Sequence, residues 1–204
     1  MLVMVERSLW MQKVDTDPGH SQWYVDRFRA MAKDGADLDG EARFVDAMAP
    51  RNAHILDAGC GPGRTGGYLA RAGHRVVGVD VDPVLIAAAH QDHPGPSWIV
   101  GDLAELDLPA RGIDQKFDVI VSAGNVMAFL APSTRVPVLN RLAAHLVENG
   151  RIVTGFGAGR DYLFEEYLAD VALAGLRPEL LLASWDLRPW AQNAGFLVAV
   201  LTHR

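Results

Sequence analysis

The sequence has little of what secreted, membrane-embedded or nucleic-acid-binding proteins usually contain. Cys60 is the only cysteine, so no disulfide can form within the chain and nothing indicates an oxidising compartment. Acidic residues (25) outnumber Lys and Arg (19), and no run of basic residues is present. A net charge of -6 argues against a broad nucleic-acid interface.

Long apolar segments are also missing. The longest mostly apolar stretch, residues 119–131, contains Asn125 and is shorter than the ~20 residues of a membrane helix. The N-terminus includes Glu6 and Arg7 among its apolar residues, unlike a signal peptide. We therefore expect a cytoplasmic protein, a monomer or a homodimer, with no membrane and no nucleic-acid partner.

Half of the 204 residues are hydrophobic, which suits one domain with a substantial core. We expect residues 1–50 to form an N-terminal helical cap and residues 51–204 the main domain. Within the cap, residues 1–19 give no clear element, and residues 15–20 are typical of a loop. Helices are predicted over 21–32 and 41–48. The first of them carries aromatic residues that either pack on the domain or close over a ligand.

The main domain alternates short apolar runs with amphipathic segments. Strands are predicted at 55–56, 75–80, 98–101, 117–122 and 151–156, and helices at 64–72, 83–90, 134–147 and 162–174. Two further strands, 180–185 and 196–202, form an expected antiparallel pair. Strands separated by helices predict βαβ units with right-handed crossovers. The fold class is therefore α/β, with a doubly wound and mostly parallel sheet.

A glycine-rich turn follows the first strand and leads into a helix. Its glycines, Gly59, Gly61 and Gly63, tolerate positive φ and let a ligand approach the backbone at a helix N-terminus. The dinucleotide-binding fingerprint requires a further glycine where this chain has Arg64, and a phosphate-binding P-loop sequence is absent. Asp57 before the turn would repel a pyrophosphate and attract an ammonium group.

Acidic or small polar residues follow four consecutive strands. Asp57, Asp80 and Asp102 end or follow the first three, and Gly124 and Asn125 come after the fourth. In parallel sheets, ligands bind at these carboxyl ends. Asp80 lies about 20 residues after the first glycine of the turn, the spacing at which an acid accepts from ribose hydroxyls. Asp80 could alternatively stabilise the N-terminus of the next helix, but Asp82 is already placed to do this.

Taken in order, these motifs resemble those of the class I S-adenosylmethionine-dependent methyltransferases, over about residues 53–157. The resemblance implies a Rossmann-like sheet of seven strands in the order 3-2-1-4-5-7-6, with an antiparallel last strand. It implies S-adenosylmethionine as cofactor and S-adenosylhomocysteine as product. Asp102 would accept from the adenine amino group. The implied cofactor-binding residues are Asp57, Ala58, Gly59, Cys60, Gly61, Gly63, Arg64, Asp80, Val81, Gly101, Asp102, Leu103, Ala123, Gly124 and Asn125.

The fourth motif departs from one branch of that family. Asn125 is followed by Val126 and Met127 rather than by the Pro-Pro-aromatic sequence that holds an amino group of a base. The resemblance therefore favours methyl transfer to an oxygen or nitrogen, less so a carbon, of a small molecule. Trp23, Tyr24 and Phe129 are the predicted acceptor-binding residues. No catalytic base and no metal site are predicted, and Arg64 either binds the cofactor carboxylate or pairs with a surface acid.

Three other functions stay open at this point. A nicotinamide-dependent oxidoreductase is disfavoured by Arg64 and Asp57 in the glycine turn. A regulatory or partner module would bind S-adenosylmethionine without turnover. A methyltransferase acting on protein or RNA would share all of the cofactor motifs. The sequence does not name the acceptor.

Overall fold

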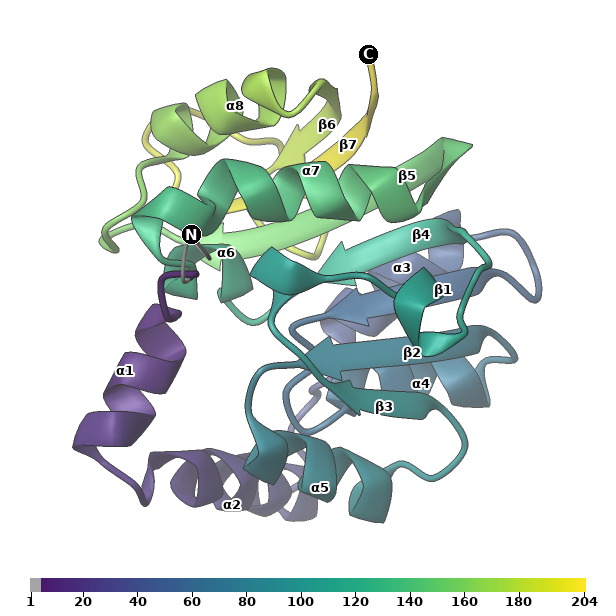
Figure 1. Cartoon of the computed structure of the whole chain (residues 1–204), viewed down its shortest axis with the longest axis vertical. Coiled ribbons are helices and arrows are strands. Elements are labelled where there is room, and N and C mark those ends of the chain that lie inside the picture. Colours follow the sequence, from purple (N-terminus) through teal and green to yellow (C-terminus); the bar gives the residue numbers. More distant parts are fainter. Residues whose placement is uncertain (1–4) are drawn as a thin grey trace.

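The computed structural model describes residues 5–204, so the first four residues of the predicted cap lie outside the described part of the chain. Seven strands form one sheet in the predicted order, β3-β2-β1-β4-β5-β7-β6 (Figure 1). β7 is antiparallel to both of its neighbours, and the pairs among β1 to β5 are parallel. The predicted fold class, strand order and antiparallel last strand are therefore confirmed. The strands are β1 (His54–Ala58), β2 (Arg75–Asp80), β3 (Ser97–Val100), β4 (Phe117–Ser122), β5 (Leu146–Gly157), β6 (Leu176–Leu182) and β7 (Phe196–His203).

Helices cover both faces of the sheet (Figure 1). The α-helices are α1 (Leu9–Thr16), α2 (His20–Lys33), α3 (Gly40–Met48), α4 (Arg64–Arg71), α5 (Pro83–Asp92), α6 (Val126–Phe129), α7 (Arg135–His145) and α8 (Phe164–Leu173), with short 3-10 turns η1 (Leu103–Glu105), η2 (Pro109–Arg111) and η3 (Pro132–Thr134). α7 and α8 pack on one face, and α3 and α4 pack on the other. In Figure 1, α1 lies beside the carboxyl ends of the strands, and α2 packs against α5.

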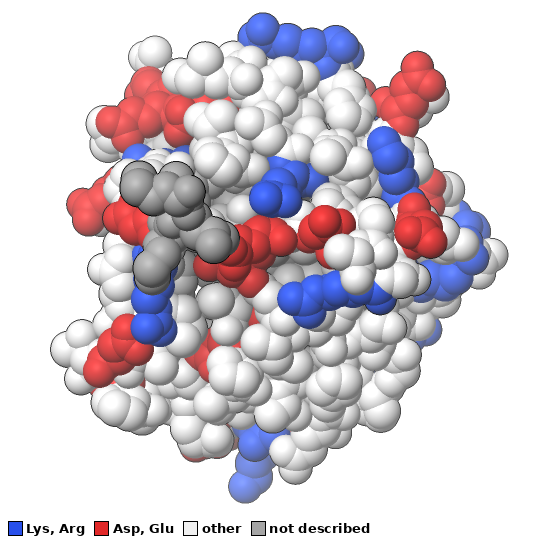
Figure 2. Space-filling view, in the orientation of Figure 1, with Lys and Arg blue, Asp and Glu red and all other residues white. Residues whose placement is uncertain are grey.

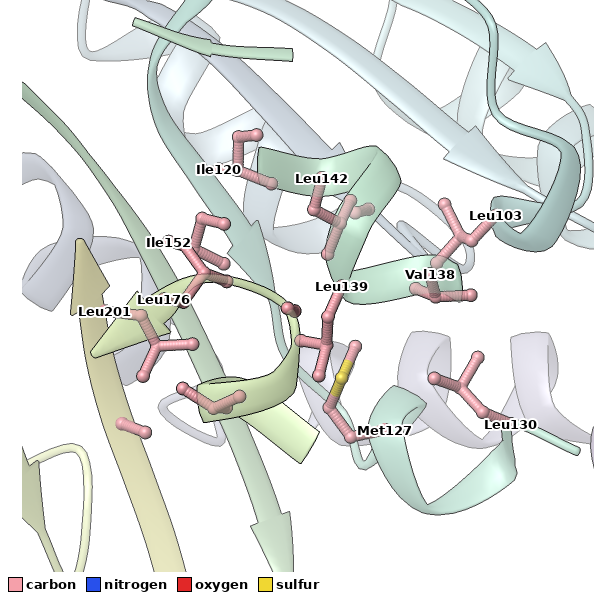
Figure 3. Packing of buried hydrophobic residues seen from close by; sticks show 14 of the residues in the cluster. Leu103, Ile120, Met127, Leu130, Val138, Leu139, Leu142, Ile152, Leu176 and Leu201 are labelled. Carbon is pink, nitrogen blue, oxygen red and sulfur yellow. The ribbon is translucent and has the colours of Figure 1, made fainter. Parts of the chain in front are cut away.

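The central strands are apolar because both of their faces are buried. In β4, Ile120 faces α7, whereas Val119 and Val121 face α3 and α4. Figure 3 shows the larger cluster, in which Leu139 and Leu142 of α7 point toward the side chains of β4 and β5. Successive side chains of the strand therefore point to opposite faces of the sheet and pack into two separate hydrophobic cores.

Trp98 of β3 fixes how the edge of the sheet packs. Its ring lies against the backbone of Gly78 in β2, where an added Cβ would stand 2.3 Å from two ring carbons. The ring also contacts Gly66 of α4, and its Nε1 donates to the carbonyl of His93 at 2.9 Å. Small residues on two elements therefore make room for one large aromatic side chain.

The secondary structure differs from the prediction in three segments discussed here. Residues 9–16, for which no element was expected, form α1, with Ser8 as the N-cap that accepts from the backbone N–H of Met11 at 3.2 Å. The helix predicted to reach residue 147 ends at His145, because Leu146 already pairs with Phe117 as the start of β5. β6 begins four residues before its predicted start, directly after Gly175, and includes Pro178 beside an irregularity in the strand register.

Figure 2 shows acidic and basic side chains interspersed over the visible face, with no continuous basic area. Across residues 5–204, no helix is long and apolar enough to cross a membrane.

We predict that Gly78→Ala destabilises the fold, because the new Cβ would overlap the Trp98 ring. Overpacking of this kind costs about 1–3 kcal/mol. Urea denaturation of purified wild type and variant measures this loss directly. Gly40→Ala is the matched control, because Gly40 begins α3 and an added Cβ there would have no neighbour within 4 Å. Equal stability of the Gly78→Ala and Gly40→Ala variants would contradict the packing role of Gly78.

Candidate active site

A cavity lies at the carboxyl ends of the parallel strands, where the sequence places its acidic residues. Asp57 of β1, Asp80 of β2 and Asp102 after β3 line it, together with Ala123 and Gly124 after β4. α1 and α2 supply the opposite wall through Trp10, Tyr24 and Phe28, among others. The cavity is therefore bounded by the sheet edge on one side and by the N-terminal helices on the other.

The glycine turn after β1 is folded onto the ends of its neighbouring strands. Gly59 has φ +80°, and its backbone N–H donates to the carbonyl of Val79 at 2.8 Å. A Cβ at Gly59 would lie 2.4 Å from the side chain of Val126 in α6. Both the backbone conformation and the close approach of Val126 therefore require glycine at this position.

Asp80 connects the glycine turn to the start of α5. One carboxylate oxygen accepts from the backbone N–H of Gly61 at 2.8 Å, and the other accepts from that of Asp82 at 2.9 Å. Burial raises the pKa of Asp80 to about 6, although both hydrogen bonds act to lower it. Each oxygen retains a lone pair that can accept from a ligand hydroxyl.

Asp57 is a second buried carboxylate at this edge. It accepts from the backbone N–H of Gly66 at 2.8 Å, and burial raises its pKa to about 7. Arg64, the nearest basic residue in the turn, instead makes a bidentate ion pair with Glu41 of α3 at 2.9 and 3.0 Å. Among residues 5–204, neither Asp57 nor Asp80 has a salt bridge to a basic side chain.

These features fit S-adenosylmethionine and do not fit a dinucleotide. The cavity wall combines two buried carboxylates with glycine turns at Gly61 and Gly124, where an added Cβ would project toward Tyr24. A ligand with an ammonium, a sulfonium and ribose hydroxyls supplies positive charge and donors to such a wall. A pyrophosphate would bring negative charge to carboxylates that form no ion pair with a basic side chain of the described residues.

The structure brings most of the predicted site residues to this cavity. Those that line it are Tyr24, Asp57, Gly59, Cys60, Gly61, Arg64, Asp80, Val81, Asp102, Leu103, Ala123, Gly124 and Phe129. Five others do not line it, namely Trp23, Ala58, Gly63, Gly101 and Asn125. Ala58 is fully buried in the core, and Gly63 packs against Ala89 and Trp98.

Asn125 supports the site from behind. It adopts a left-handed conformation with φ +69°, and its side chain accepts from the backbone N–H of Gly157 at 2.8 Å. This bond holds the loop after β4 against the end of β5. Asn125 itself does not line the cavity, whereas its neighbours Ala123 and Gly124 do.

Trp23 and Tyr24 are adjacent in sequence but lie on different faces of α2. Trp23 is 53% exposed, stacks on His20 and lies under the guanidinium of Arg27. The ring of Tyr24 extends over the cavity and lies 3.9 Å from where an added Cβ at Gly61 would stand. The hydroxyl of Tyr24 lies 3.9 Å from where an added Cβ at Gly124 would stand. The predicted acceptor-binding role is therefore compatible with the position of Tyr24, whereas the structure places Trp23 outside the cavity.

Residues 8–24, which we call the N-terminal strap, contribute lining residues that the sequence analysis did not identify. Ser8 and Trp10 line the cavity, and Phe28 lies one turn beyond the strap. Ser8 was recognisable as a helix N-cap, and that cap predicts α1 itself. Nothing in the local sequence indicates that α1 reaches the active site.

Asp82 fastens the strap to the sheet. One oxygen of its carboxylate caps α5 by accepting from the backbone N–H groups of Val84 and Leu85, as predicted for an N-cap. The other oxygen accepts from Trp10 Nε1 at 2.8 Å and from the Ser21 hydroxyl at 2.5 Å. Because the backbone of Asp82 also donates to Asp80, the strap and the predicted ribose acceptor share one set of hydrogen bonds.

Residues 55–150 match a protein family described as a methyltransferase domain. Over 92% of its length the chain is 50% identical to a TehB-like SAM-dependent methyltransferase from Corynebacterium glutamicum, whose crystal structure it covers completely with a TM-score of 0.87. It is 40% identical to magnesium-protoporphyrin O-methyltransferase of Rhodobacter capsulatus over 116 residues. This aligned region covers 53% of this chain and 48% of that protein. A probable S-adenosylmethionine-dependent methyltransferase of Mycolicibacterium smegmatis is 33% identical over 109 residues, 52% of this chain and 41% of that protein. The chain therefore spans about half or less of the length of these two curated relatives.

We predict that Asp57→Asn changes how the stability of the ligand-free protein depends on pH. The pKa of Asp57 is 3.8 in the unfolded chain and about 7 in the folded protein. Such an acid stabilises the fold most when the pH is below 3.8, and this contribution is lost as the pH rises through about 7. The amide can still accept from Gly66 but carries no charge. Between pH 5 and pH 8 the variant should therefore gain about 2 kcal/mol relative to wild type.

Urea denaturation at the two pH values measures this gain. Asp118→Asn is the matched control, because Asp118 likewise accepts from one backbone N–H, that of His54, but is only partly buried and lies at the opposite end of its strand. If the free energy of unfolding of wild type and of Asp57→Asn changes with pH in the same way, the loss of stability at high pH does not come from the Asp57 charge.

Proposed function

Because this chain belongs to the class I S-adenosylmethionine-dependent methyltransferases, we propose that it transfers a methyl group to an oxygen or nitrogen atom of a small molecule. The observation that carries the proposal is the cavity at the sheet edge. One wall has carboxylates that form no salt bridge within residues 5–204, and the other wall has aromatic rings. The first wall suits the cofactor, and the second suits an acceptor.

The cofactor supplies an already activated methyl group, so the chain chiefly has to bind and align the two reactants. Asp80 would accept from the ribose hydroxyls, and Asp102 from the adenine amino group. Asp57 would place negative charge near the ammonium of the cofactor. Alignment of this kind lowers the activation free energy of a bimolecular reaction by up to about 7–11 kcal/mol.

A small acceptor is favoured because the N-terminal strap covers the cavity. Trp10 of α1 and Tyr24 of α2 lie across the edge at which the fold family brings acceptor and cofactor together. A base within a folded RNA, or a side chain of a folded protein, would have to displace them. The interspersed charges on the visible face offer no track for a nucleic-acid backbone (Figure 2).

Calorimetric titration tests the cofactor assignment. We expect S-adenosylhomocysteine to bind the wild type and NAD not to bind. Asp80→Ala should weaken the binding of S-adenosylhomocysteine at least about tenfold, because the variant lacks the acceptor for the ribose hydroxyls.

Asp26→Ala is the control for loss of an acidic residue, because Asp26 is exposed on α2 and does not line the cavity. Binding of NAD, or of neither ligand, by a folded wild type would contradict the proposal. Unchanged affinity of the Asp80→Ala variant would refute the role of Asp80 alone.

Methyl transfer from isotopically labelled cofactor tests the acceptor class. Cell extract is separated into a small-molecule fraction and a fraction of protein and RNA, and we expect label only in the first. The double variant Tyr24→Ala, Phe129→Ala should reduce that labelling about tenfold or more, because both rings line the cavity. Labelling confined to the macromolecular fraction would favour a protein or RNA methyltransferase, and binding without any labelled product would favour a regulatory module.

A further inference from the structure

One wall of the cavity is formed by three aromatic rings from three helices. Trp10 of α1 meets Tyr24 of α2 edge-on, with ring centroids 5.2 Å apart, and Phe129 of α6 edge-on at 5.6 Å. All three residues line the cavity, and Leu130 continues the apolar wall. A flat apolar molecule is the ligand that such a surface complements.

Trp10 is the central member of this wall and is held in place from outside it. Its Nε1 donates to the carboxylate of Asp82, which also accepts from Ser21. The polar end of the indole is thereby satisfied, and the carbon surface of the ring can face the cavity. The position of the ring is therefore set by the structure before any acceptor arrives.

The wall lacks a group that could remove a proton from the acceptor. Its hydroxyls belong to Ser8, which caps α1, and to Tyr24, whose pKa is raised, chiefly by burial. Among the described residues that line the cavity, the carboxylates all lie on the cofactor side and no histidine or lysine is present. An acceptor that must lose a proton before it attacks finds no base on this wall.

Charge further restricts the acceptor. Arg64, the one basic residue among the described lining residues, is committed to Glu41. An anionic acceptor would therefore enter beside Asp57 and Asp80 with no uncommitted basic residue among the described lining residues. The guanidinium of Arg160 lies over the Phe129 ring, 5.4 Å from its centroid, but Arg160 does not line the cavity. Aromatic surroundings instead favour a ligand that becomes positively charged.

We infer that the acceptor is a small, flat heteroaromatic molecule with a neutral ring nitrogen, and that Trp10 is a specificity-determining residue for it. The inference rests on the proposed methyl transfer. The nitrogen lone pair forms the new bond to the methyl carbon, and the electrons of the carbon–sulfur bond remain on sulfur. The positive charge passes from the sulfonium to the ring, and no proton is transferred.

Three six-membered rings serve as matched probes: pyridine, phenol and benzoate. With wild type and S-adenosylmethionine, we expect N-methylpyridinium to form at least about tenfold faster than the methylated products of phenol or benzoate, as mass spectrometry can measure. Faster transfer to phenol or benzoate would overturn the inference, as would no transfer to pyridine by an enzyme that binds S-adenosylhomocysteine. Loss of S-adenosylhomocysteine binding would instead overturn the proposed function.

Variants of Trp10 separate its ring from its hydrogen bond. Trp10→Ala should raise the KM for pyridine about tenfold and leave the affinity for S-adenosylhomocysteine within about twofold of wild type. Trp10→Phe keeps a smaller aromatic ring but removes the donor to Asp82, and it should retain the preference for pyridine over phenol. Trp23→Ala is the matched control from the same segment, because Trp23 is exposed and lies outside the cavity. If Trp10→Ala and Trp23→Ala have the same KM for pyridine, Trp10 does not determine specificity.

Discussion

The active site depends on the hydrogen bonds that the Asp80 carboxylate accepts from two backbone N–H groups. One comes from Gly61 in the turn after β1, and the other from Asp82 at the start of α5. These bonds fix two loops from neighbouring strands relative to one another. Through the side chain of Asp82, the same network reaches Trp10 and Ser21, so the sheet edge and the N-terminal strap are held by connected hydrogen bonds.

Much of the fold was predictable because its central strands are short apolar runs with clear ends. β2 and β4 have their predicted bounds, since charged residues or glycine turns limit both. The start of β5 and the position of β6 were not predictable from local patterns. Leu146 is a good helix residue that pairs with Phe117 instead, and Pro178 lies in a strand where the register is irregular. Both outcomes are decided by contacts with distant residues.

The common position of Asp57, Asp80 and Asp102 at one edge of the sheet was predictable from a rule about parallel sheets. The position of Trp10 in the cavity wall was not predictable in this way. Trp10 reaches the site through a hydrogen bond to a residue 72 positions away, and no local pattern encodes such a contact. The distinction between Trp23 and Tyr24 likewise depends on how α2 is rotated about its axis against α5.

The two buried carboxylates also affect the stability of the protein. Burial makes their charges costly, and no basic side chain of the described residues forms an ion pair with either. A ligand that brings positive charge or hydrogen-bond donors to Asp57 and Asp80 therefore raises the free energy of unfolding as it binds. Cells degrade proteins chiefly from their unfolded states. The proposed binding of S-adenosylmethionine at this site would therefore couple the lifetime of the protein in a cell to the supply of that cofactor.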